Sequence, residues 1–355
     1  MALHVDFETQ SASNLKVEGS YLYAKNETTS VLCVGVALNG EKPKVLKPES
    51  FRRYLKSIRF NESTEVKAHN AAFELDIWNH CGRKRYGWPQ LTIEQTDCTM
   101  VRAYAMGLPG GLDDCSAALG IRCGKDMAGH RVMLKLSRPK PKPLQYGIVE
   151  FYTPEEVPED FKALYRYCGH DVFLERDIDS LVLPLSPSEK ELWCVDYAIN
   201  QRGLRIDVEA AVGAKNFADA EKESFDRAIR TVTEGAVDTC NQRDAIIRYL
   251  KNEHSIQLRD LSAPTVSAFL SRKSLPLKAR QVALLRQRAS KTSTSKIGAM
   301  LTAQLGDGRL RGLFQFHAAT TGRWGGRRLQ PQNLSRGELS QEQVSRAIEL
   351  LRSFA

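Results

Sequence analysis

Three signals are missing from this sequence, and each absence excludes a class of protein. No stretch approaches the ~18 consecutive apolar residues that a membrane-spanning helix needs. The N-terminus, MALHVDFETQ, lacks the basic segment and the apolar segment of a secretory signal. The eight cysteines form no Cys-x-x-Cys pair, so no zinc pattern is present and free thiols are expected. We therefore expect a cytoplasmic chain that does not bind membranes.

Acidic residues are scarce in one part of the chain, between Arg272 and Arg336. This stretch has fourteen Lys and Arg residues and a single acid, Asp307, which gives a net charge of +13, whereas the whole chain has only +9. A solvated helix face usually mixes both signs. A block of one sign favours a polyanionic partner, because each neutralised phosphate releases counterions.

The 355 residues are enough for about two domains, and the first part alternates predicted strands with predicted helices. The predicted strands are His4–Phe7, Val31–Leu38, Lys44–Leu46 and Val66–Ala68, and the predicted helices are Ala71–Cys81, Thr96–Met106, Leu112–Leu119 and Pro158–Leu181. We expect an α/β domain with a mixed sheet over residues 1–185. After a Pro-rich boundary, residues 186–310 are predicted to be mostly helical, and residues 311–355 form a third region.

Three short motifs contain most of the residues with catalytic potential. Asp6 and Glu8 lie two apart on a predicted strand and therefore share a face. The sequence HNAAFE, which ends in Glu74, occupies a predicted strand-to-helix junction. Tyr167 and Asp171 lie four apart on a predicted helix and also share a face. Carboxylates are the ligands that Mg²⁺ and Mn²⁺ prefer, and two such ions about 4 Å apart can hydrolyse a phosphodiester bond.

In order and spacing, these motifs resemble the three exonuclease motifs of the DEDD family in its tyrosine subclass. The subclass includes the proofreading domain of DNA polymerase I-like, family A DNA polymerases. The resemblance implies a ribonuclease H-like fold and 3′→5′ exonuclease activity on DNA with two Mg²⁺ ions, for which Mn²⁺ can substitute. It implies that the metal ligands are Asp6, Glu8, Glu74 and Asp171, and that Tyr167 positions the attacking water.

The second motif departs from the family pattern, because position 74 is Glu where Asp is common. Asp76 is a rival ligand, although it should face away from Glu74 on a helix. Asn70 is expected to hold the substrate strand or to cap the following helix, and the two roles are compatible. Asp97 is expected to cap a helix or to support the site without binding metal.

The basic stretch contains a second resemblance. The segment Thr321–Leu334 (TGRWGGRRLQPQNL) looks like the family A stretch that enters the polymerase palm, and Lys291–Lys296 (KTSTSK) is similar to the tip of the thumb. Glycines allow close backbone approach, and Arg, Gln and Asn can bind phosphate, sugar or base edges. The resemblance implies that primer–template DNA contacts Arg323, Gln332 and Asn333, and also Lys291 and Ser293. It makes residues 186–310 a helical, thumb-like DNA-binding region and residues 311–355 the start of the palm.

The polymerase motifs expected further along such a chain are absent after Arg336. We therefore expect no nucleotide incorporation by this chain alone, and a separate palm and fingers chain is a candidate partner. The pattern is closest to phage enzymes, which would place the protein in the host cytoplasm. Two alternatives remain open: a non-catalytic DNA-binding half of a split polymerase, and a stand-alone exoribonuclease of the same fold.

Overall fold

The computed structural model describes residues 1–121, 126–141, 149–290, 295–319, 321–334, 337 and 339–355. The chain divides into two compact units, and each contains two stretches of sequence. The first unit is Met1–Arg205 with Ala303–Leu334, and the second is Ile206–Thr302 with Ser335–Ala355. These units differ from the boundaries at 185/186 and 310/311 that the sequence predicts. No helix within these described ranges is long and apolar enough to cross a membrane.

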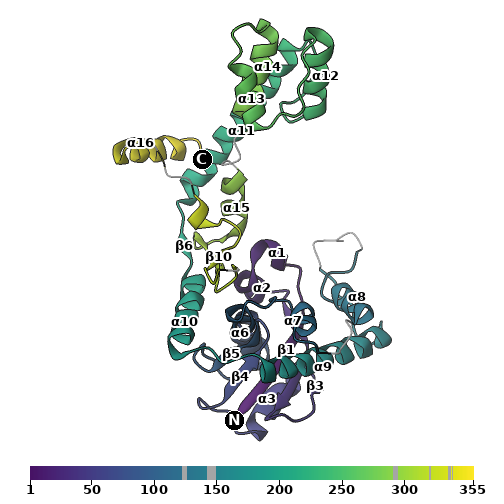
Figure 1. The fold of residues 1–355 in the computed structure, drawn as a ribbon. Coiled ribbons are helices and arrows are strands. Elements are labelled where there is room, and N and C mark those ends of the chain that lie inside the picture. Colours follow the sequence, from purple (N-terminus) through teal and green to yellow (C-terminus); the bar gives the residue numbers. More distant parts are fainter. Residues whose placement is uncertain (122–125, 142–148, 291–294, 320, 335–336, 338) are drawn as a thin grey trace. The chain divides into compact units, whose positions relative to one another are not determined.

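The first unit is built on one five-stranded mixed sheet with the order β3-β2-β1-β4-β5 (Figure 1). Strand β1 pairs antiparallel with β2 and parallel with β4, and β4 pairs parallel with β5. The strands are β1 (Ala2–Gln10), β2 (Ser30–Leu38), β3 (Lys44–Leu46), β4 (Glu65–Ala68) and β5 (Thr96–Cys98). The predicted mixed α/β fold is confirmed. Residues Thr96–Cys98 form a strand, however, and not the start of a helix.

Helices cover this sheet and supply its connections. Pro158 and two acids in the first turn favour the start of the long helix α9, which matches its predicted bounds. The predicted helix at Ala71 is split, because a π-helical turn at Ile77–Gly82 follows α4. The helices are α1 (Leu15–Glu18), α2 (Ser20–Lys25), α3 (Pro48–Ser57), α4 (Ala71–Asp76), α5 (Arg83–Tyr86), α6 (Thr99–Ala105), α7 (Leu112–Ala118), α8 (Met127–Leu136), α9 (Pro158–Leu181) and α10 (Pro187–Arg202).

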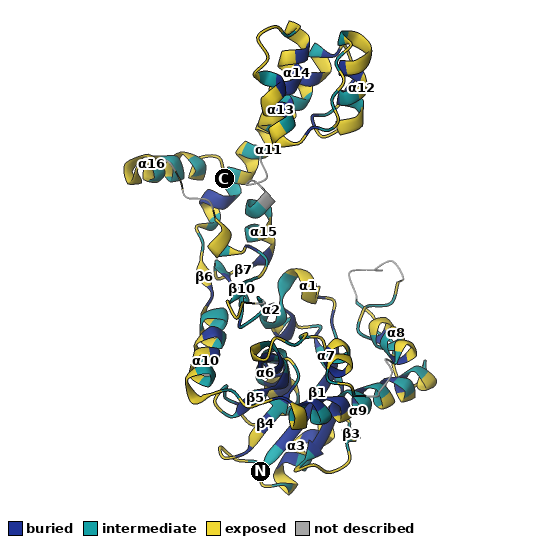
Figure 2. Ribbon diagram, viewed as in Figure 1, coloured by how far each residue is buried: buried dark blue, intermediate teal, exposed yellow. Residues whose placement is uncertain are grey.

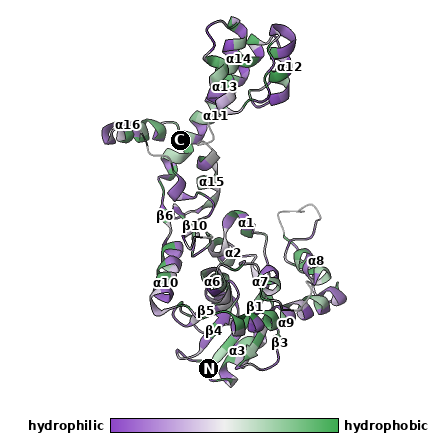
Figure 3. Ribbon diagram, in the orientation of Figure 1, coloured by the Kyte–Doolittle hydropathy of each residue, from purple (hydrophilic) through white to green (hydrophobic). Residues whose placement is uncertain are grey.

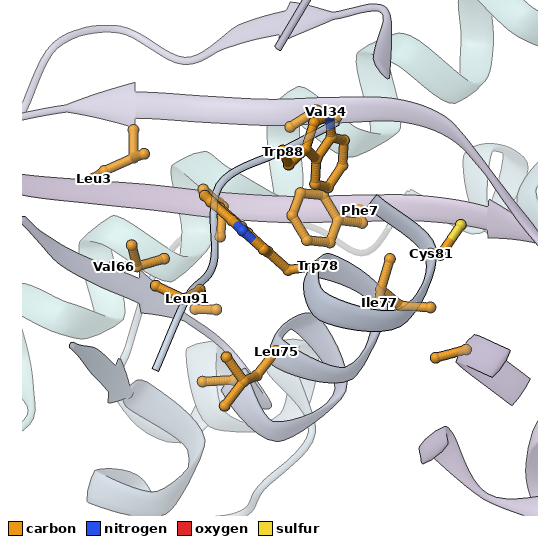
Figure 4. Close-up of a cluster of buried hydrophobic side chains, with 14 of the residues drawn as sticks. Leu3, Phe7, Val34, Val66, Leu75, Ile77, Trp78, Cys81, Trp88 and Leu91 are labelled. Atoms are coloured by element: carbon orange, nitrogen blue, oxygen red, sulfur yellow. The ribbon is translucent and has the colours of Figure 1, made fainter. Parts of the chain in front are cut away.

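The main core of this unit lies on one face of the sheet. Leu3 and Phe7 point from β1 into a cluster rich in aromatic rings (Figure 4), and Val5 belongs to the same cluster. The ring centroid of Phe7 lies 5.3 Å from that of Trp88, and Trp78 donates its indole N–H to the carbonyl of Pro89 at 2.7 Å. Burial of these side chains fixes which face of β1 points inward (Figure 2).

The segment Ala303–Leu334 adds two small sheets to the first unit. Strands β7 (Gln304–Leu305) and β8 (Arg309–Leu310) join β6 (Leu204–Arg205), and β9 (Phe314–Gln315) pairs with β10 (Gly325–Gly326). Asn200 of α10 bonds to both backbone groups of Phe314, at 3.0 Å each. These bonds explain why the segment groups with α10, and a short 3₁₀ turn, η3 (Pro331–Asn333), follows.

The second unit is helical, as the sequence predicts. Its own core gathers side chains such as Ile229, Leu250 and Phe269. The helices are α11 (Val208–Val232), α12 (Arg243–His254), α13 (Ala263–Leu270), α14 (Leu277–Ala289), α15 (Ser295–Ala303) and α16 (Gln341–Arg352). Gly213 lets α16 approach α11, since a Cβ at this glycine would lie 1.7 Å from the carbonyl oxygen of Leu351. In Figure 3, α16 mixes hydrophobic and hydrophilic residues, which suits a helix packed on one side.

Candidate metal centre

Strand β1 separates core residues from acidic residues by its alternation. Phe7 enters the aromatic core, so Asp6 and Glu8 point to the opposite face of the sheet, toward α9. The register of the β1–β2 ladder shifts between Glu8 and Thr9, near the end of the strand, as at a β-bulge. Bulges reorient side chains next to them, which suits a site at this position.

Helix α9 brings the third motif to this face. Ligand oxygens of Asp6, Glu8 and Asp171 all lie within 4.8 Å of one another. Tyr167 lies one turn before Asp171 on α9, and its hydroxyl is near enough to lower the pKa of the Asp171 carboxyl. The structure therefore brings together four of the five residues that the sequence analysis assigned to catalysis.

A glycine on the neighbouring strand allows this close approach. Gly35 lies opposite Asp6 in the β1–β2 ladder. A Cβ at Gly35 would lie 2.6 Å from Cγ2 of Val172 and 2.9 Å from Sγ of Cys168, both on α9. No larger residue fits without moving the helix, so Gly35 sets how close Asp171 comes to β1. A lone glycine in an apolar strand is the signal that could have identified it.

Glu74 lies close to this cluster but outside the group of three. It is buried on α4, and its carboxylate is near enough to Asp6 and Glu8 for their charges to affect its pKa. Asp76, the rival ligand, accepts hydrogen bonds from the hydroxyl of Tyr197 at 3.1 Å and from the amide of Gln201. Asp76 is therefore occupied on the other side of α4, as the helical spacing predicts.

Burial raises the pKa of every acid in this site. It is the main cause that raises the pKa of Asp6 to about 6 and that of Asp171 to about 8, and the charge of Asp6 adds to the shift at Asp171. Burial also raises the pKa values of Glu8 and Glu74 well above their usual range. Burial also raises the pKa of the Tyr167 hydroxyl, so it stays protonated and can donate one hydrogen bond while its oxygen accepts another.

A divalent cation fits this donor set. Oδ2 of Asp6 and Oε2 of Glu74 are buried and have no hydrogen-bond partner among the described residues. Buried carboxylates without partners are costly, and a bound cation removes that cost and lowers their pKa values. Oxygen ligands of this kind favour Mg²⁺ or Mn²⁺.

Other residues near the motifs have structural partners. Asn70 adopts a left-handed backbone conformation with φ 75° and stays exposed, and its side chain does not cap α4, so the expected capping bond is absent. Asp97 pairs with Arg102 at 2.7 Å and does not cap a helix. His69 is bound to Thr99 and to the carbonyl of Gly110 at 2.9 and 2.8 Å.

Helix α8, which is not among the predicted helices, packs closely against Tyr167 next to the site. Asp126 caps this helix by accepting a hydrogen bond from the backbone N–H of Gly129 at 2.8 Å. A Cβ at Gly129 would lie 2.8 Å from the ring of Tyr167, so the glycine lets α8 pack against that ring. The Asp-x-x-Gly cap was the available signal.

A cavity of about 730 Å³ adjoins the acidic cluster. Its lining includes Glu8 of the acidic cluster and the aromatic ring of Phe73. Lys16 and Arg138 add two basic side chains to this lining. The cavity therefore combines apolar, basic and acidic side chains next to the acidic cluster.

The basic stretch divides into structural and exposed cations. Arg286 and Arg311 are buried, and Arg311 forms an ion pair with Asp307 at 2.6 Å. Arg328 donates to the carbonyl of Glu18 at 2.8 Å. The charge of +13 therefore overstates the number of cations available to a partner.

The structure describes three of the five predicted DNA contacts in this stretch. Arg323, Gln332 and Asn333 are exposed, and Asn333 bonds to Gln330 at 2.9 Å. Lys291 and Ser293 lie outside the described residues.

Comparison with known proteins gives a consistent result. No protein-family model matches the chain. A DNA polymerase of Bacillus phage SP02 is 30% identical over 364 residues, which cover 98% of this chain and 55% of that protein. The chain is homologous to a phage DNA polymerase. It spans about half the length of this relative.

The fold of this polymerase homologue agrees with its sequence. It resembles the POL domain of Pol1 from M. smegmatis, solved with DNA primer-template and dNTP, with a TM-score of 0.53 and 13% identity. The match covers 87% of this chain and 50% of the other. The expected likeness to family A DNA polymerases is thereby confirmed.

Proposed function

We propose that this chain is a metal-dependent 3′→5′ exonuclease that removes nucleotides from DNA ends as the proofreading part of a polymerase. The observation that supports this best is the convergence of Asp6, Glu8 and Asp171 within 4.8 Å on one face of the sheet. The partnerless buried oxygens of Asp6 and Glu74 support a cation there, and Glu74 is proposed as the fourth ligand.

Two Mg²⁺ or Mn²⁺ ions at such a site would supply a nucleophile at neutral pH and stabilise the leaving oxygen. The protein's own groups would hold and orient the reactants. The protonated hydroxyl of Tyr167 is proposed to orient the attacking water, because burial raises its pKa and keeps it uncharged. Glu8 and Phe73 would flank the last nucleotide in the adjoining cavity, and Lys16 and Arg138 would pair with phosphates.

DNA is the proposed substrate because the homologue is a DNA polymerase. Arg323, Gln332 and Asn333 are proposed to contact the primer–template duplex, since they are exposed next to Gly325 and Gly326. Lys291, Ser293 and Asn70 remain proposed DNA contacts on the resemblance alone. A separate palm and fingers chain also remains a proposal.

The test is release of nucleoside monophosphates from a single-stranded DNA labelled at its 3′ end, with Mg²⁺ and then with EDTA. Wild-type protein should release product only with metal, and Asp171→Asn should fall to background. Asp196→Asn is the matched control, because Asp196 is equally an acid of the first unit, is 6% exposed and lies outside the acidic cluster. Full activity of Asp171→Asn would remove the site assignment, and faster release from RNA would favour the exoribonuclease alternative.

A further inference from the structure

One buried acid of α9 has no part in the proposed reaction. Glu175 is 2% exposed, and its Oε1 lies 3.0 Å from Nδ1 of His4, which is 5% exposed. Burying these two polar groups costs free energy that their mutual contact only partly offsets. Stability alone therefore does not account for this buried pair.

The pair joins the same two elements that hold the acidic cluster. His4 precedes Asp6 by two residues on β1, so both side chains lie on one face of the strand. Glu175 follows Asp171 by four residues on α9, so both lie on one face of the helix. The His4–Glu175 contact therefore lies next to the place where Asp6 faces Asp171, two residues earlier on β1 and one turn later on α9.

The contact is anchored to the rest of the sheet. Nε2 of His4 lies 3.6 Å from Asp179, one further turn along α9. Asp179 is in turn bound by Lys67 of β4 at 3.1 Å and by Arg102 of α6. The strand, the helix and the neighbouring strand are thus connected by one network of buried and partly buried polar groups.

Such a connection is needed because the clustered acids repel one another. The charge of Asp6 raises the pKa of Asp171, which means that the two carboxylates favour separation when both are ionised. β1 and α9 are far apart in the sequence, so only tertiary contacts fix their spacing. Glu175 lies outside the group of three, and its Oε1 is bonded to His4.

We infer that Glu175 and His4 are positioning residues that hold Asp6 and Asp171 at the spacing a divalent cation needs, and so set metal affinity. The inference rests on the proposed function, because it concerns the same metal site. Groups that orient metal ligands typically change affinity or activity by about 10–100-fold when removed.

The experiment measures Mn²⁺ binding by titration calorimetry, so it does not depend on activity. Wild type is compared with Glu175→Ala, Glu175→Gln and His4→Ala, and with Asp196→Asn as the control. We expect about tenfold weaker binding in Glu175→Ala and His4→Ala with an unchanged number of ions. Glu175→Gln should be intermediate because it keeps a hydrogen-bonding group next to His4, and the control should match wild type.

Circular dichroism first confirms that each variant is folded at the titration temperature. If Glu175→Ala is unfolded, Glu175→Gln and His4→Ala decide the result. Wild-type affinity in folded variants would overturn the inference and leave the proposed function standing. Loss of one bound ion would also overturn it, since Glu175 would then be a ligand. No Mn²⁺ binding by wild type would refute the proposed function itself.

Discussion

Replacing Gly35 with alanine is the sharpest available test of how the acidic cluster is assembled. The new Cβ would lie 2.6 Å from Cγ2 of Val172, 2.9 Å from Sγ of Cys168 and 3.1 Å from the carbonyl oxygen of Cys168. Carbon atoms in contact prefer about 3.5–4.0 Å, so the Val172 contact is short by about 1 Å. The two closest atoms belong to side chains, whereas the carbonyl oxygen of Cys168 is part of the backbone of α9 and must give by a few tenths of an ångström. The helix itself must move away from the sheet.

Two magnitudes follow from a shift of this size. Overpacking a core typically costs about 1–3 kcal/mol in the free energy of unfolding. Misplacing reactive groups by about 1 Å can lower a rate about 100-fold. Since Asp171 moves with α9 and Asp6 stays on β1, we expect Gly35→Ala to lose up to about 100-fold in exonuclease rate while it remains folded.

The assay pairs urea unfolding with monophosphate release at a temperature where the variant is fully folded. Gly169→Ala is the matched control, because it places the same methyl group on α9 but meets only Cγ2 of Val45, at 3.3 Å. The control should retain a rate close to wild type. If folded Gly35→Ala keeps the wild-type rate, the spacing of α9 from β1 does not govern the site, and the geometric argument is wrong.

Three further predictions use the same structure. Tyr167→Phe removes the hydroxyl that is proposed to orient the attacking water. Release should slow about tenfold, the value of about one hydrogen bond, with little change in urea unfolding. An unchanged rate would contradict the role of Tyr167. Asp6 and Asp171 have pKa values of about 6 and about 8 in the folded protein, compared with the ordinary value of 3.8. Between these values the folded chain binds more protons than the unfolded chain does. The metal-free protein should therefore lose stability as pH rises from about 4 to about 8. The Mg²⁺-induced rise in Tm should therefore be larger at pH 8 than at pH 5, and an equal rise would contradict it. Arg323→Ala should reduce, by about 1, the slope of the logarithm of the duplex-binding constant against the logarithm of salt concentration. Replacing Arg311, which is buried and ion-paired, should mainly affect stability. Equal slopes in Arg323→Ala and wild type would show that Arg323 does not contact phosphate.

Local periodicity was enough to predict much of the first unit. Helix α9 was predicted with its correct bounds, because Pro158 suits the first turn and the apolar residues recur at helical spacing. For Thr96–Cys98 the sequence wrongly predicts the start of a helix, where the structure has strand β5. It is only three residues long, Thr96–Cys98, and its strand conformation comes from pairing with β4 and not from its own composition.

The basic stretch shows a second limit of sequence reasoning. Counting charges indicated a polyanion-binding block, and Arg323 is indeed exposed. Arg286, Arg311 and Arg328 instead stabilise the fold through carbonyl groups and one ion pair. Composition counts every arginine alike, because it contains no information about which guanidinium groups are buried.

The same distinction explains what could be predicted of the candidate metal site. Periodicity specifies which face a residue occupies, so Asp6 with Glu8, and Tyr167 with Asp171, were each paired correctly within their own element. It does not specify the distance between two elements far apart in the sequence. That distance is set by Gly35, which has no side chain, and by Glu175, which resembles an ordinary helix-surface acid in sequence. Because binding a cation depends on spacing to within about 1 Å, the residues that control the site most are those whose sequence signal is weakest.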